Sequence, residues 1–202
     1  MIYYICILDF EATCFDNDEV PRNKMEIIEF PSILYKIDTS NNSYEYISEF
    51  HKYIKPTYKP LLTEFCKNLT GIKQEIVNNS DTIDVVYNDH IKWLDTHIKE
   101  NDKFAILTCG AWDLKTILPN EIKNKQLKPH KYYNRFINIK DEFNYFYNKN
   151  AKGMLDMLKI LKIKLTGRHH SGIDDTKNIA KILLHMIKDG HHDYKFHYQK
   201  YL

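Results

Sequence analysis

Two acidic residues interrupt an apolar segment near the start of the chain, CILDFEATC, from Cys6 to Cys14. The apolar residues around Asp9 and Glu11 indicate a strand in the interior of a sheet. Because alternate residues of a strand point to one face, the two carboxylates should lie close together, with Phe10 on the other face. Their repulsion and lost hydration cost on the order of several kcal/mol unless something compensates. No lysine or arginine lies in the strand to pair with them.

The composition is typical of one folded domain with a real core, since 43% of the 202 residues are hydrophobic. A net charge of +2 excludes a polyanionic protein and says little about partners. The four cysteines show no CxxC spacing, which favours reduced thiols over a disulfide framework or a zinc site. No apolar run reaches the roughly 20 residues of a membrane span, and the start of the chain lacks the pattern of a signal peptide. We therefore expect no membrane association and an intracellular location, cytoplasmic or nuclear.

The pattern of apolar and turn residues predicts a mixed α/β sheet covered by helices. Strands are expected at 3–10, 25–37, 44–56, 103–109 and 135–140, with a hairpin turn at TSNNS, residues 39–43. Helices are expected at 81–100, 112–118, 140–147, 153–161 and 174–188, the second of them limited by Pro119. In such sheets, binding sites form where strands end and helices begin.

Further acids stand at such junctions. Asp113 follows the apolar run FAILTCGAW, and Asp174 and Asp175 open the last predicted helix after GRHHSGI. Each could simply cap a helix, and for Asp113 and Asp174 taken singly capping is the better interpretation. Asp9 and Glu11 are different, because acids in the middle of a strand have no helix to cap.

Divalent metal ions would resolve the repulsion between the acids. Mg²⁺ and Mn²⁺ prefer carboxylate oxygens and water. Two such ions about 3.5–4 Å apart can hold the attacking and leaving oxygens of a phosphodiester displacement. Such a hydrolase also needs a base, and His170 is five residues before Asp175. We interpret His170 as that base and His169 as a surface residue.

These residues, in this order, resemble the DEDDh group of the DnaQ-like 3′–5′ exonucleases, which have an RNase H-like fold. The site of that group maps to Asp9, Glu11, Asp113, His170 and Asp175. The segments LDFEATC, EIIEFPSIL, FCKNLTGI, LTCGAWDL, INIK and GRHHSGIDDTKNIAKI resemble the Eri-1-like branch in particular. The motifs span residues 7 to 182, nearly the whole chain.

The resemblance implies a central mixed sheet of five or six strands between helices, two Mg²⁺ or Mn²⁺ ions, and release of nucleoside 5′-monophosphates. The exonuclease domain would span residues 1–190, followed by a tail at 191–202. The branch acts chiefly on RNA 3′ ends, whether single-stranded, in an overhang or on a stem-loop, and some members also cut DNA. Longer relatives carry an N-terminal SAP region, and we expect any selectivity that this region provides to be either absent here or supplied by a partner.

Candidate contacts to the terminal nucleotide surround the acids. Trp112 could stack on a base, with core anchoring at nearly even weight. Ala12 and Thr13 would line the pocket, Leu114 would keep an apolar contact, and Phe10 could face substrate only through its backbone. Lysines and arginines at 124–136 and 191–202 could follow phosphates. For the tail we favour a packed or frayed end, and for 124–136 both interpretations stay open.

Two other functions share most of these features. One is an exonuclease directed at DNA on the same site, and the other is a nucleic-acid-binding adaptor that has lost catalysis. The presence of all five key residues argues against the adaptor.

Overall fold

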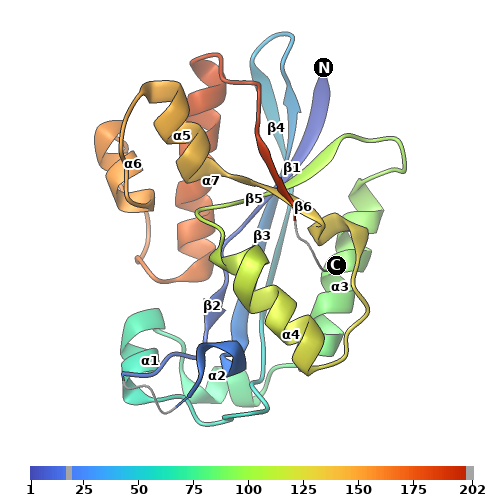
Figure 1. Ribbon diagram of the computed structural model, residues 1–202, viewed down its shortest axis with the longest axis vertical. Helices are drawn as coiled ribbons and strands as arrows, with labels where there is room; N and C mark the ends of the chain where they lie inside the picture. The colour runs from blue at the N-terminus through green and yellow to red at the C-terminus, as the bar shows by residue number, and fades with distance from the viewer. Residues whose placement is uncertain (17–19, 199–202) are drawn as a thin grey trace.

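The computed structural model describes residues 1–16 and 20–198, which form a mixed sheet with helices on both faces (Figure 1). The strands are β1 (Ile2–Leu8), β2 (Glu11–Ala12), β3 (Ile27–Asp38), β4 (Ser43–Tyr53), β5 (Phe104–Thr108), β6 (Arg135–Asn138) and β7 (Phe196–Tyr198). The α-helices are α1 (Glu64–Thr70), α2 (Gln74–Asn78), α3 (Ile83–His97), α4 (Leu118–Asn124), α5 (Ile139–Tyr147), α6 (Met154–Ile160) and α7 (Gly172–Lys188). Two 3₁₀ turns, η1 (Arg22–Lys24) and η3 (Lys131–Tyr133), and a π-helix, η2 (Asp113–Ile117), complete the described elements.

The order of the strands brings the carboxyl ends of β1 and β5 to one edge of the sheet. β4 pairs with β3, β3 with β1, β1 with β5, β5 with β6 and β6 with β7. β1, β5 and β6 run parallel, whereas β3, β4 and β7 are antiparallel to their neighbours. β2 pairs with β3 beyond the end of β1, so it continues β1 past a break at residues 9 and 10.

Helices cover both faces of the sheet, which explains why its central strands are almost entirely apolar. The core on one face includes Leu8 and Phe30 of the sheet and Leu94 of α3, and the core on the other includes Ile7 of β1 and Ile182 of α7. In Figure 1, α5, α6 and α7 lie on the side of the sheet away from α3 and α4. A third, small apolar cluster joins α1 and α2 to the amino end of β3.

The predicted mixed sheet between helices is confirmed, and so is the β3–β4 hairpin, in which Asp38 pairs with Ser43. The described residues form seven strands rather than five or six, because the short β2 and β7 add to the sheet. The helix expected at 112–118 does not end at Pro119. Pro119 lies in the first turn of α4, where its missing N–H is not needed, and the helical chain continues to Asn124.

The tail packs against the domain as far as residue 198. β7 pairs with β6, and the buried His191 Nε2 lies 3.0 Å from Oε2 of the buried Glu142 on α5. Residues 199–202 of the predicted tail lie outside the described part of the chain. Among the described helices, none combines the length and the apolar character that a membrane crossing requires.

Candidate active site

Asp9 and Glu11 lie where β1 ends and β2 begins, at the edge formed by the carboxyl ends of β1 and β5. Carboxylate oxygens of Asp9, Glu11 and Asp175 all lie within 4.8 Å of one another. Phe10, between the first two acids, is buried in the core, with its ring centroid 4.5 Å from that of Phe30. The alternation predicted for this segment is therefore confirmed.

Asp113 is the first residue of the π-helix η2, directly after β5 and its loop. Its Oδ1 accepts a hydrogen bond of 3.0 Å from the main-chain N–H of Phe10. The wide π turn is closed by the N–H of Leu118, which donates to the carbonyl of Asp113. Such turns are frequent at functional sites, and here the turn holds Asp113 against the segment between Asp9 and Glu11.

Asp175, the fourth residue of α7, is almost fully buried and binds the loop before the helix. Its Oδ2 accepts hydrogen bonds of 2.9 Å each from the His169 ring Nδ1 and the His170 main-chain N–H. The two histidine rings stack with their centroids 3.9 Å apart, and His170 has a φ of +65°. Backbone of this kind is rare outside glycine and clusters at functional sites. Because its ring bonds to the buried Asp175, His169 is more than the surface residue expected from the sequence.

A cleft of about 300 Å³ opens at this edge of the sheet. The five residues predicted to carry the chemistry all line it: Asp9, Glu11, Asp113, His170 and Asp175. Trp112, 38% exposed, and Phe10 line it too. Sequence reasoning missed five further lining residues: Cys109, Gly153, Met154, His169 and Ile179. Distance along the chain explains the omission of Gly153 and Met154, because only the fold brings the start of α6 to this cleft. Cys109 and Ile179 each stand four residues from a predicted acid, and His169 directly precedes His170.

Three of the predicted substrate contacts lie away from the cleft. Leu114 is fully buried in the core of the sheet. Thr13 is buried as well, and its Oγ1 accepts a 2.9 Å hydrogen bond from the N–H of Glu26. Ala12 packs in the same core as Leu114.

Burial raises the pKa of every acid in the cleft, and repulsion by neighbouring carboxylates raises those of Asp9 and Glu11 further. The pKa of Asp9 is well above its usual value, first because of burial and then because of the nearby Asp113 and Glu11. Burial, followed by the charges of Glu29 and Asp175, raises the pKa of Glu11 to about 8. Burial raises the pKa of Asp113 to about 6, and it also raises that of Asp175. Without a positive charge, the four acids cannot all be ionised at neutral pH.

These residues fit divalent metal ions of the hard class. The donors are carboxylate oxygens together with imidazole, gathered in two overlapping groups that share Asp175. Oδ1 of Asp175 is buried and has no hydrogen-bond partner among the described residues. A buried carboxylate oxygen without a partner is costly, and a cation is the partner that the neighbouring carboxylates also require.

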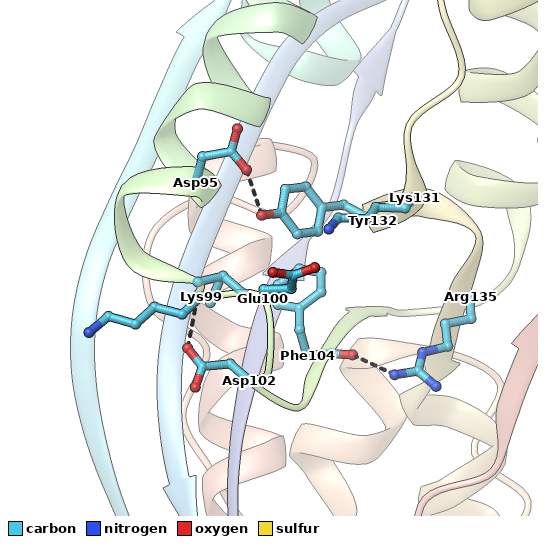
Figure 2. Close-up of a pocket in the computed structure, with 9 residues that line it drawn as sticks. Asp95, Lys99, Glu100, Asp102, Phe104, Lys131, Tyr132 and Arg135 are labelled. Atoms are coloured by element: carbon cyan, nitrogen blue, oxygen red, sulfur yellow. Dashed lines mark hydrogen bonds between the residues drawn. The ribbon is translucent and has the colours of Figure 1, made fainter.

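A larger cavity, of about 430 Å³, lies at the opposite end of the sheet, by the first residues of β5 and β6 (Figure 2). Three of its six charged side chains have hydrogen-bond partners among the described residues: Asp95, Asp102 and Arg135. The Tyr132 hydroxyl donates to Asp95 at 2.6 Å, and the Arg135 guanidinium donates to the carbonyl of Phe104 at 3.3 Å. None of the residues predicted from the sequence to be catalytic lines this cavity.

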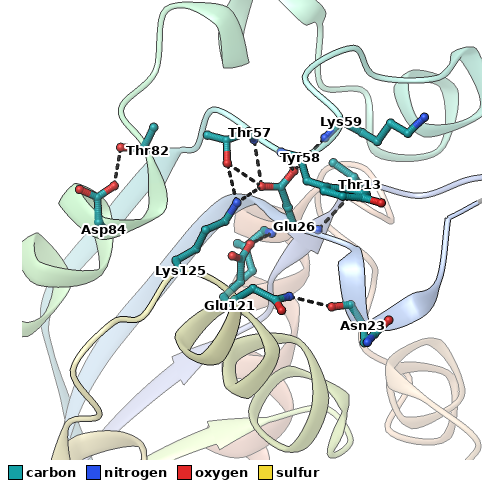
Figure 3. A network of polar contacts seen from close by, with 12 residues as sticks. Thr13, Asn23, Glu26, Thr57, Tyr58, Lys59, Thr82, Asp84, Glu121 and Lys125 are labelled. Atoms are coloured by element: carbon teal, nitrogen blue, oxygen red, sulfur yellow. Dashed lines mark hydrogen bonds and ion pairs between the residues drawn. The ribbon is translucent and has the colours of Figure 1, made fainter.

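A network of polar contacts lies beside the end of β2, where Glu26 bonds to Thr13 (Figure 3). The Glu26 carboxylate accepts hydrogen bonds from the N–H groups of Thr57 and Tyr58, at 2.9 and 2.8 Å. The Lys125 ammonium donates to Glu26 at 2.6 Å. This lysine of the basic segment 124–136 therefore serves an internal ion pair.

A family model described as exonuclease, RNase_T, matches residues 6–183. The chain belongs to this family. One relative of this chain is 3′-5′ exoribonuclease 1 of Rattus norvegicus. The two sequences are 37% identical over 191 residues, which cover 93% of this chain and 54% of the relative. ERI1 exoribonuclease 2 of Xenopus laevis is 35% identical over 203 residues, covering 93% of this chain and 29% of the relative. The chain thus spans about half or less of these two relatives.

A solved structure of the nuclease domain of 3′hExo, a DEDDh family member bound to rAMP, is also similar to this RNase_T family member. The identity is 34%, the TM-score is 0.87, and the match covers 97% of this chain and 96% of that domain. The RNase H-like fold and the resemblance to DEDDh exonucleases are therefore confirmed, and membership of this family implies dependence on metal ions.

Proposed function

We propose that this chain is a metal-dependent 3′–5′ exoribonuclease that removes nucleoside 5′-monophosphates from RNA ends. The observation that carries the proposal is the convergence of Asp9, Glu11, Asp113 and Asp175 with His170 in one cleft. The RNase_T relatives named above support the reaction and its direction, since one of them is a 3′-5′ exoribonuclease.

The four acids would hold two Mg²⁺ or Mn²⁺ ions. When bound, such ions stabilise the negative charge that develops on the oxygens of a phosphodiester under attack. Without them the acids repel each other, as the raised pKa values of Asp9 and Glu11 indicate. The same repulsion is then the source of the metal affinity.

His170 is the proposed general base. A neutral imidazole, with a usual pKa near 6.5, can accept a proton from water at neutral pH. The main chain of His170 is held by Asp175. The His170 ring belongs to the same potential ligand group as the His169 ring and the Asp175 carboxylate. The ring accepts the proton of the water that attacks the last phosphodiester.

Trp112 is the proposed platform for the terminal base. It lies beside Asp113, lines the cleft and keeps 38% of its surface exposed. Stacking of a base on an aromatic ring contributes about 1–3 kcal/mol and depends little on sequence, as an exonuclease requires. Ala12, Thr13 and Leu114 would act indirectly, by shaping the core behind the cleft. The proposed substrates are single-stranded, overhanging and stem-loop 3′ ends.

The decisive experiment digests 5′-labelled RNA with Mg²⁺ or Mn²⁺ and analyses both the shortened RNA and the released mononucleotide. The expected result is stepwise shortening from the 3′ end with release of 5′-monophosphates. Asp9→Ala should abolish turnover while circular dichroism shows an intact fold. A folded Asp9→Ala protein that still releases nucleotides near the parent rate contradicts the assignment of this cleft.

Matched RNA and DNA oligonucleotides, digested side by side, test the preference for RNA. Faster digestion of the DNA would assign the site to a DNA exonuclease. Binding of RNA without any hydrolysis in either metal would instead indicate an adaptor.

A further inference from the structure

A fifth buried acid, Glu29 on β3, lies beside the cleft without lining it. It is 1% exposed and stands directly opposite Glu11 in the β2–β3 pair. A buried carboxylate opposite another acid is unfavourable by charge alone. Glu29 has no part in the reaction proposed above, so its place in the fold needs another explanation.

The hydrogen bonds of Glu29 lead to the first turn of α7. Oε2 accepts from the N–H of Gly172 at 3.0 Å, and Oε1 accepts from the N–H of Ile173 at 3.2 Å. The first N–H groups of a helix have no partner within the helix, and Ser171 makes no side-chain cap here. Glu29, from a strand far away in the sequence, takes the place of that cap, and the helix dipole favours its negative charge.

The start of α7 is also in close contact with the strand that carries the acids. A Cβ added to Gly172 would lie 2.8 Å from the carbonyl oxygen of Asp9 and 3.1 Å from Oε2 of Glu29. The helix therefore begins directly on the main chain of Asp9. Because Asp175 is three residues further along α7, any shift of the first turn changes the distance between its carboxylate and those of Asp9 and Glu11.

His51 on β4 holds Glu29 from the other side. Its Nε2 lies 2.8 Å from Oε1 of Glu29, and its side chain is 26% exposed. With a proton on Nε2, the ring donates the third hydrogen bond to the carboxylate. Glu29 is thus fixed between β4 and α7.

We propose that Glu29, held by His51, is a positioning residue that sets the place of Asp175 against Asp9 and Glu11. The proposal rests on the function proposed above. The role requires both the length of the side chain and its two acceptor oxygens: the carboxylate must extend from β3 to both N–H groups of α7 while it accepts from His51.

The test compares Glu29→Gln, which keeps the length and removes the charge and one acceptor, with Glu29→Asp, which keeps the charge and is one methylene shorter. Mn²⁺ alone is titrated into each protein by calorimetry, and kcat and KM are measured on a single-stranded RNA. Residues that orient metal ligands typically contribute roughly 10–100-fold to metal affinity or activity. We expect both variants to lose that much in Mn²⁺ affinity and kcat, with KM for RNA nearly unchanged.

His51→Gln is the milder variant, because a side chain on β4 that is 26% exposed can be replaced without loss of the fold. It should weaken Mn²⁺ binding in the same direction and by less. Glu45→Gln, an exposed acid on the same strand, is the matched control and should behave as the parent. Thermal unfolding in EDTA checks that each variant is folded.

The outcomes separate the two proposals. Parent-like Mn²⁺ binding and kcat in folded Glu29 or His51 variants overturn the positioning role and leave the proposed function intact. A Glu29→Asp protein that matches the parent while Glu29→Gln fails would show that charge matters and not reach, which also overturns it. A parent protein that neither binds Mn²⁺ nor shortens RNA overturns the proposed function itself.

Discussion

At the scale of single residues, the two adjacent histidines have separate roles. The His169 ring Nδ1 donates to Oδ2 of Asp175, whereas His170 reaches Asp175 through its main-chain N–H. In the described part of the chain the His170 ring makes no hydrogen bond, although it stacks on His169. In the proposed reaction the free ring takes the proton from water, and the ring bound to Asp175 orients the carboxylate.

This difference predicts unequal effects of two alanine substitutions. His170→Ala should lower kcat by roughly 10²–10⁴, the usual contribution of a general base, and leave Mn²⁺ binding intact. His169→Ala should lower kcat by less, because Asp175 keeps its bond to the His170 N–H. Single-turnover kinetics on RNA measure both effects. A larger loss in His169→Ala would transfer the role of the base to that residue.

The first two acids of the cleft can be recognised from the sequence, because the evidence for them lies within one short segment. Two acids at positions i and i+2 of a buried strand are unfavourable without a cation, and Asp9 and Glu11 alone show this spacing. The left-handed backbone of His170, beside the contact between His169 and Asp175, cannot be predicted from the residue types. Leu114 directly follows Asp113 in the sequence, but the turn of η2 directs its side chain into the core.

At the scale of elements, α1 is joined to the loop that carries the histidines. The helix ends at Gly71, which has a φ of +77°, and the Arg168 guanidinium lies against this glycine and donates to the carbonyl of Asn68. The N–H of Arg168 in turn donates to Asp174 at 2.9 Å. Arg168 therefore holds the loop between the end of α1 and the start of α7.

Gly71→Ala should consequently affect both stability and catalysis. The left-handed backbone costs about 1–2 kcal/mol for a residue with a Cβ, and the added methyl would overlap the Arg168 side chain. We expect a lower melting temperature and a lower kcat. Gly190→Ala is the matched control, since Gly190 also has a positive φ, of +94°, but has no atom within 4 Å of the added Cβ. It should lose stability alone, and an equal kcat loss in both variants would contradict the role of Arg168.

The periodic pattern is clearest in the long elements. α3 and α7 present an apolar face over several turns, and β3 and β4 are joined by a turn of typical composition. α1 and α2 have only seven and five residues, too few for a period to appear, although Thr63 and Gly71 are cap signals that could have indicated α1. β2 and β7 are strands only because β3 and β6 offer them partners.

At the scale of the whole molecule, the site depends on the order of strands. β1 and β5 are parallel neighbours, so the residues after them, Asp9 and Asp113, meet at one edge. α7 packs on the same sheet and adds Asp175. Residues more than one hundred positions apart thus share a cleft. Periodicity alone does not give the order of the strands. The order of the acids and His170 along the chain, through its resemblance to the DEDDh group, predicts the fold that brings them together.

The cluster of acids also links the stability of the whole domain to pH. Glu11, with a usual pKa of 4.5, has a pKa of about 8 in the folded protein, and burial is the first cause. Between these values the folded state holds a proton that the unfolded state has released, so the stability falls as the pH rises. Each unit of such a shift corresponds to about 1.4 kcal/mol. In EDTA, the free energy of unfolding should therefore decrease from about pH 5 to pH 8, as measured by urea unfolding.

Mn²⁺ should reverse this trend, because a bound cation favours the ionised acids that the fold brings together. At pH 8 the gain in unfolding free energy on adding Mn²⁺ should be large, and at pH 5, where protons already neutralise the cluster, it should be small. Glu11→Gln removes one titrating acid and should flatten the dependence in EDTA, whereas Glu45→Gln on the exposed face of β4 should not. A parent protein whose stability in EDTA is independent of pH, or rises towards pH 8, would show that the acids are already neutralised by the protein itself and that no metal is needed to hold them together.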